Sequence, residues 1–101
     1  MALEISQEIF KQRLENRLNF SIIDLSKEKK HDFESVEFLS SCSIEDIKTK
    51  ILSPTQNVIL FSLDKGDSIK DLADSLTEQG YHFIYYYQGD ESDKVLDQGL
   101  N

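Results

Sequence analysis

The sequence predicts an α/β fold: a small three-layer sandwich whose central, mainly parallel sheet of four to five strands is flanked by helices. Two observations predict it. Short runs rich in β-branched and aromatic residues lie at 20–25, 36–41, 57–62 and 82–87, and segments with apolar residues at helical spacing separate most of them. Alternation of this kind is typical of βα crossovers, which place helices on both faces of a parallel sheet.

The size of the chain predicts one domain. Its 101 residues, 39% of them hydrophobic, supply apolar material for one core. With one proline and four glycines, the chain has no segment that resembles a linker. We therefore expect a single domain over 1–101, with a frayed tail at about 97–101.

The charge argues against several function classes. The chain contains 11 Lys and Arg residues and 19 Asp and Glu residues. The resulting net charge of −8 repels nucleic acid. Charges interrupt the N-terminal segment, so neither a signal peptide nor a membrane span is expected, and the predicted location is cytoplasmic. The single cysteine, Cys42, cannot form a disulfide within the chain, and together with His31 and His82 it does not give a metal-ligand spacing. No metal, other cofactor or membrane partner is predicted.

The first half of the chain predicts one helix and two strands. Ser6 can cap the helix, whose apolar side is formed by Ile9, Phe10, Leu14 and Leu18. The run at 20–25 is apolar on both sides, as in a buried parallel strand, and the run at 36–41 suggests a strand nearer the edge. Residues 27–35 break the pattern as a loop or a single helical turn, so the path of 27–43 stays open.

The second half predicts two further helix and strand pairs. A capping box at Ser43 and Asp46 begins a helix that Pro54 ends, and its buried face is formed by Ile44, Ile47 and Ile51. The run at 57–62 is the most apolar and is expected to be the central strand.

The helix that begins at Ser68 has the clearer pattern. Its capping box is formed by Ser68 and Asp71, and Gly80 ends it. Its buried face is formed by Ile69, Leu72, Ala73 and Leu76. A strand at 82–87 follows, with a last short helix around Val95 and Leu96.

The segment "VILFSLDKGDS", residues 58–68, joins the predicted central strand to a helix. Ligands of α/β sheets bind beyond the carboxyl ends of strands, near a switch point in the topology. The candidate substrate loop therefore consists of Ser62, Leu63, Asp64, Lys65, Gly66, Asp67 and Ser68.

Four segments carry a resemblance to a known family: "ISQEIFKQRLEN", "FSIIDL", "NVILFSLDKGDS" and "LADSLTEQGYHFIYYYQG". In order and spacing they resemble the landmarks of single-domain rhodaneses over nearly the whole chain, without a gap. The matching positions are Asp24, the strand "VILFS", and the closing pattern of Leu76, Gly80, Tyr81 and Gly89. The resemblance implies a rhodanese-like fold.

The same resemblance implies lost chemistry. Rhodaneses form a persulfide on a cysteine that begins a loop resembling C-x-x-G-x-R-S, and Ser62 stands at that position. The loop glycine comes one place late as Gly66, Asp67 replaces the arginine, and Asp64 adds a carboxylate that opposes anion binding. Ser26 replaces a second family arginine, and residues 34–39 replace the family's "GHIPGA" stretch.

Other reactive residues have structural interpretations. Cys42 is expected to be a buried or half-buried structural thiol, His31 a solvated loop residue, and His82 a surface or hydrogen-bonded residue. The tyrosines at 85–87 are expected to pack against the helices, although aromatic residues are also favoured at interfaces.

Three functions follow as hypotheses. The leading one is a catalytically inactive rhodanese-like domain that binds or regulates a protein, with a basic partner favoured by the charge. An alternative is an active sulfurtransferase or hydrolase that uses Cys42 or Ser62. A third is a structural subunit of a homo- or hetero-oligomer, with the tyrosine strand at its interface.

Overall fold

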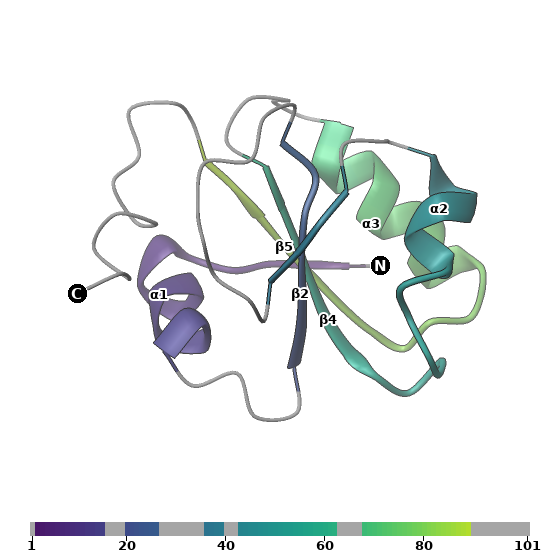
Figure 1. Cartoon of the computed structure of the whole chain (residues 1–101), viewed down its shortest axis with the longest axis horizontal. Coiled ribbons are helices and arrows are strands. Elements are labelled where there is room, and N and C mark those ends of the chain that lie inside the picture. Colours follow the sequence, from purple (N-terminus) through teal and green to yellow (C-terminus); the bar gives the residue numbers. More distant parts are fainter. Residues whose placement is uncertain (1, 16–19, 27–35, 40–42, 63–67, 90–101) are drawn as a thin grey trace.

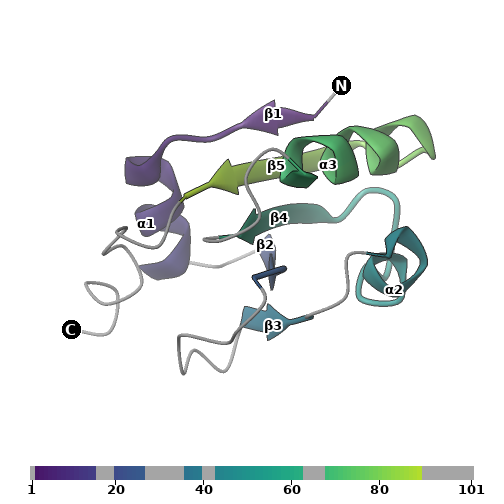
Figure 2. The same ribbon diagram turned by 90° about the horizontal axis from the view of Figure 1, so that it is seen from above.

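A five-stranded, entirely parallel sheet forms the centre of the part of the chain that the structure describes. The structure is a computed structural model and describes residues 2–15, 20–26, 36–39, 43–62 and 68–89. The strands are β1 (Leu3–Glu4), β2 (Phe20–Asp24), β3 (Val36–Phe38), β4 (Asn57–Ser62) and β5 (Phe83–Gln88), and the helices are α1 (Gln7–Glu15), α2 (Ile44–Lys48) and α3 (Ser68–Glu78). Figure 1 shows these elements along the chain. The sheet order is β1-β5-β4-β2-β3 (Figure 2), which confirms the predicted α/β sandwich.

Helices cover both faces of this sheet. Figure 2 shows α1 on one side and α2 with α3 on the other. Along β4, the residues Val58 and Leu60 pack toward α2 and α3, whereas Ile59 and Phe61 pack toward α1, and all four are 0% exposed. This alternation is what a strand buried on both faces requires, and it confirms β4 as the central strand.

The first helix starts where the sequence predicts. The backbone N–H of Ile9 donates to the Ser6 hydroxyl oxygen at 3.2 Å, as in an N-cap. Phe10 and Leu14 are buried, but Ile9 is 41% exposed. The prediction that Ile9 belongs to the core face was therefore wrong, because its side chain lies at the border of that face. The predicted contact of Leu18 lies outside the described residues.

The second helix is shorter than its pattern predicts. Ser43 occupies the N-cap position but makes no side-chain capping hydrogen bond, and the helix ends at Lys48. The next backbone N–H groups, up to that of Ile51, donate to carbonyls three residues earlier, which tightens the chain into turns. Ile51 is still buried. The predictions of a side-chain capping box and of a helix that continues as far as Pro54 were thus wrong. The predicted burial of Ile47 and Ile51 is confirmed.

The third helix ends in a turn that glycine makes possible. Gly80 has a φ of +104°, which residues with a Cβ rarely adopt. The backbone N–H of Tyr81 donates back to the Leu76 carbonyl at 3.3 Å, so this turn closes the helix. The buried stripe of Ile69, Ala73 and Leu76 is confirmed, and Leu72 is partly buried. The predicted cap at Ser68 lies outside the described side chains.

We expect Gly80→Ala to lower the free energy of unfolding by about 1–2 kcal/mol, because alanine is strained at positive φ. A Cβ at this position would meet no atom within 4 Å, so the cost is conformational. Gly80→Asn is the matched control and should cost less, since asparagine tolerates this region. Urea unfolding measures both; equal losses would contradict the explanation.

The two edge strands compare differently with the sequence prediction. Strand β1, at one edge of the sheet, was not predicted, because two residues are too few for a periodic signal. Strand β3 lies at the other edge, as expected, and is described for Val36–Phe38. The predicted loop at 27–35, the helix around Val95 and Leu96 and the frayed tail at about 97–101 lie outside the described residues.

Candidate functional site

The carboxyl ends of β2 and β4 form the switch point of this sheet. These strands are neighbours, but β3 lies beyond β2 whereas β5 lies beyond β4, so the chain leaves them in opposite directions. Such an arrangement opens the crevice in which α/β proteins bind ligands. The buried polar residues of the described chain, Asp24, Ser26 and Ser62, all lie here, each 1% exposed.

Ser62 is the last residue of β4 and is held by β5. It pairs in register with Gln88, and the backbone N–H of Gly89 donates to its carbonyl oxygen at 3.0 Å. Because Val58 and Leu60 face α2 and α3, strand alternation places Ser62 on that same face. Gln88 lies beside it on the same face by its pairing. Sequence reasoning missed Gln88, although its position just before Gly89, at the end of the aromatic strand, indicated the same edge.

Asp24 faces the opposite side of the sheet. It pairs in register with Phe61, whose ring packs toward α1, and one of its carboxylate oxygens accepts the backbone N–H of Ser26 at 2.9 Å. The bond shapes the turn after β2, as an Asx turn does. Since Asp24 and Ser62 lie on opposite faces, the sheet does not bring this carboxylate to the serine hydroxyl.

The histidine that the structure describes also lies away from Ser62. His82 is exposed, precedes the first residue of β5, and its backbone N–H donates to the Pro54 carbonyl at 2.9 Å. Ser62 pairs with the other end of β5. His82 therefore has the surface position that was predicted for it.

Several predicted site residues lie outside the described part of the chain. These are residues 63–67 of the candidate loop, together with Cys42 and His31. Ser68 is the first residue of α3. The structure thus places the two ends of the loop, at the end of the central strand and at the start of a helix, as the sequence predicts.

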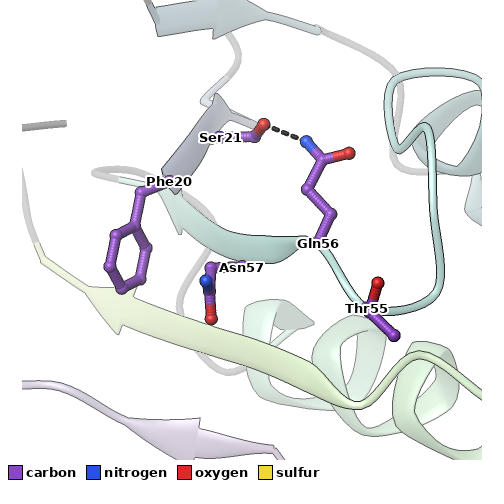
Figure 3. Close-up of a pocket in the computed structure, with 5 residues that line it drawn as sticks. All are labelled: Phe20, Ser21, Thr55, Gln56 and Asn57. Carbon is purple, nitrogen blue, oxygen red and sulfur yellow. Dashed lines mark hydrogen bonds between the residues drawn. The ribbon is translucent and has the colours of Figure 1, made fainter. Parts of the chain in front are cut away.

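A hollow of about 460 Å³ lies at the other edge of the sheet. It is lined by Phe20, Ser21, Thr55, Gln56 and Asn57, at the amino ends of β2 and β4 (Figure 3). The Gln56 amide donates a hydrogen bond to the Ser21 hydroxyl. None of these side chains is ionisable near neutral pH, so the hollow offers hydrogen bonds but no acid, base or nucleophile activated by a base.

The tyrosines of β5 pack within the molecule. Tyr86 and Tyr87 are each 6% exposed, on opposite faces of the sheet, and Tyr85 is half-buried. The expected core packing is confirmed for the two buried tyrosines, and an interface could use only Tyr85 among them.

Two further features of the described residues concern metal ions and membranes. Within these ranges, no three His, Cys, Asp or Glu side chains are grouped so that they could hold a metal ion. No described helix has the length and the apolar character that crossing a membrane requires.

Comparison with known proteins finds similarity of structure. No model of a known protein family matches the sequence, and no curated protein matches it significantly. Among solved structures, the Alr3790 protein from Anabaena sp. matches with a TM-score of 0.63 and 18% identity, over 85% of this chain and 70% of that one. The polysulfide-sulfur transferase homodimer from Wolinella succinogenes matches with a TM-score of 0.68 and 21% identity, over 97% of this chain and 75% of that one. Both have the rhodanese-like fold, and the chain described here shares it.

Proposed function

We propose that this chain is a rhodanese-like domain that does not turn over a sulfur substrate and that instead acts as a binding or regulatory module, located in the cytoplasm. The observation that carries the proposal is Ser62, a buried hydroxyl at the carboxyl end of the central strand. The resemblance implies a persulfide-forming cysteine at this position. An oxygen atom cannot form the sulfur–sulfur bond of a persulfide, so the frame is retained without its reactive atom.

Among the residues that the structure describes, neither Asp24 nor the histidine is placed to act as a base for Ser62. A serine nucleophile needs a base within hydrogen-bond reach. Asp24 lies on the other face of the sheet, and His82 lies at the other end of β5. Cys42 remains the second candidate, as the only thiol in the chain.

A link to sulfur transfer remains part of the proposal. The Wolinella neighbour is a polysulfide-sulfur transferase, and a fold of this kind without its cysteine can bind a partner of such a pathway. The net charge of −8 favours a basic protein over an anionic sulfur compound.

In a thiosulfate:cyanide assay, we expect the purified chain to form no thiocyanate above the protein-free rate. Ser62→Ala and Cys42→Ser should behave like the unaltered chain, and an active rhodanese serves as the positive control. Turnover comparable with the active enzyme would overturn the proposal, and the variant that abolishes it would identify the nucleophile. Labelling with iodoacetamide at neutral pH gives a second measurement: Cys42 should react no faster than a small free thiol.

A further inference from the structure

Helix α1 leaves one corner of its sheet face uncovered. The Phe10 ring of α1 stacks on Tyr87 with a centroid distance of 4.6 Å and lies 4.7 Å from the Phe61 ring. Both partners belong to the carboxyl halves of their strands. On the same face of the sheet, the amino half of β5 and the neighbouring edge strand β1 therefore do not lie under this aromatic cluster.

Apolar side chains occupy this corner in a regular array. Leu3 pairs with Tyr85, and Tyr85 pairs with Ile59, so one row of side chains crosses the sheet on the α1 face. Phe83 and Phe20 belong to the next row toward the amino ends, on either side of Asn57. Leu3 is 62% exposed and Phe83 is 44% exposed. Exposed apolar residues that gather in one patch mark an interaction site, unlike single ones scattered over a surface.

A hollow of about 200 Å³ lies within the patch. It is lined by Ile5, Ile9, Arg13, Phe20, Ile59 and Tyr85. Pockets for cofactors and small molecules typically measure about 300–1,000 Å³, so this hollow is suited to one large side chain. A single apolar anchor in a pocket is the usual centre of a protein interface.

Charge indicates what kind of segment fits. The Arg13 guanidinium lies over the Phe20 ring, 4.7 Å from its centroid, where it already has a partner. Glu8 is exposed on α1, which borders the patch, whereas Glu4 of β1 pairs with Tyr86 and so faces the other side of the sheet. The whole chain carries a charge of −8. A second copy of the chain would bring the same negative charge and be repelled, whereas a basic segment would be attracted.

We propose that the corner formed by Leu3, Ile9, Phe20, Phe83 and Tyr85 docks a basic protein segment, which inserts one aliphatic or aromatic side chain into the hollow and places Lys or Arg beside it. This goes beyond the proposed function, because the surface lies on the α1 face and not at the loop that follows Ser62. Its test is independent of sulfur transfer.

Selection of random displayed peptides on the immobilised full chain provides the probe. We expect the enriched peptides to share an aliphatic or aromatic residue flanked by Lys or Arg, and to bind more weakly as the salt concentration rises. Phe83→Ser and Ile9→Ser should each weaken the dissociation constant of a synthesised peptide about tenfold or more. Leu52→Ser is the matched control: Leu52 is 91% exposed, lies outside the patch, and should leave the affinity unchanged.

Several outcomes would overturn the proposal. They are the enrichment of no peptide, the enrichment of acidic peptides, or an affinity that neither patch variant changes. Loss of binding in Ser62→Ala would assign the peptide to the carboxyl edge instead. A dimer in sedimentation that Phe83→Ser dissociates would show that a second copy occupies the corner. Thermal unfolding of each variant, with a midpoint close to that of the unaltered chain, excludes loss of the fold as the cause.

Discussion

Replacing Phe10 with alanine is expected to lower the free energy of unfolding by about 3–5 kcal/mol. The Phe10 side chain is 0% exposed and joins α1 to the rings of Phe61 and Tyr87. Its removal loses the transfer free energy of a buried ring and leaves a cavity that these two aromatic side chains cannot fill without leaving their positions. Because Phe10 is the largest fully buried side chain of α1, we expect the effect to exceed that of any surface substitution.

Urea unfolding followed by circular dichroism measures this change. Phe83→Ala is the matched control, because it removes the same ring from a position that is 44% exposed and should cost about 1 kcal/mol or less. A similar loss for both variants would show that Phe10 does not hold α1 against the sheet. The slope of the unfolding free energy with urea should stay unchanged if both variants unfold in two states.

The second large effect is expected for Asp24→Ala, which should lower the free energy of unfolding by about 1–3 kcal/mol. The carboxylate accepts the Ser26 N–H at 2.9 Å, and both residues are 1% exposed. Alanine would leave this buried donor without that acceptor, at the turn where the chain leaves β2. Asp24→Asn keeps an acceptor oxygen and should restore much of the stability.

The comparison of the two Asp24 variants separates the contribution of the Asp24 hydrogen bond from that of its charge. If asparagine destabilises the chain as much as alanine does, the charge of Asp24 matters more than its hydrogen bond. If instead both variants are as stable as the unaltered chain, the turn after β2 does not depend on this side chain.

The fold was predictable where local pattern and burial agree. Strand β4 has the most apolar run of the chain and occupies the centre of the sheet. The spacing of Ile69, Ala73 and Leu76 identified the buried side of α3, and the turn at Gly80 could be read from the glycine itself. In these elements the side-chain period and the position in the sandwich require the same residues.

The sequence pattern was less informative where tertiary contacts determine the length of an element or the burial of a side chain. A helical period continues through Ile51, but α2 ends at Lys48, because turns can bury the same apolar side chain. Ile9 follows the helical period of the core face and nevertheless lies at its border. Strand β1 has too few residues for a period and exists through its pairing with β5.

The candidate site could be predicted only in part. The end of the central strand and the start of α3 are properties of the local sequence, and both are found where expected. Whether Asp24 and Ser62 share a face depends on the register between β2 and β4. Register is a long-range property, and a shift of one residue moves every side chain to the other face.

The pairing of β1 with β5 has a consequence for the order in which the chain assembles. Leu3 lies beside Tyr85, although almost the whole described chain separates them in sequence. During synthesis, β1 leaves the ribosome before β5, so this pairing cannot form until β5 follows. Pairings that close so large a loop form late and slow the folding of a domain. Strand β1 is thus made before the other described strands and is among the last of them to pair.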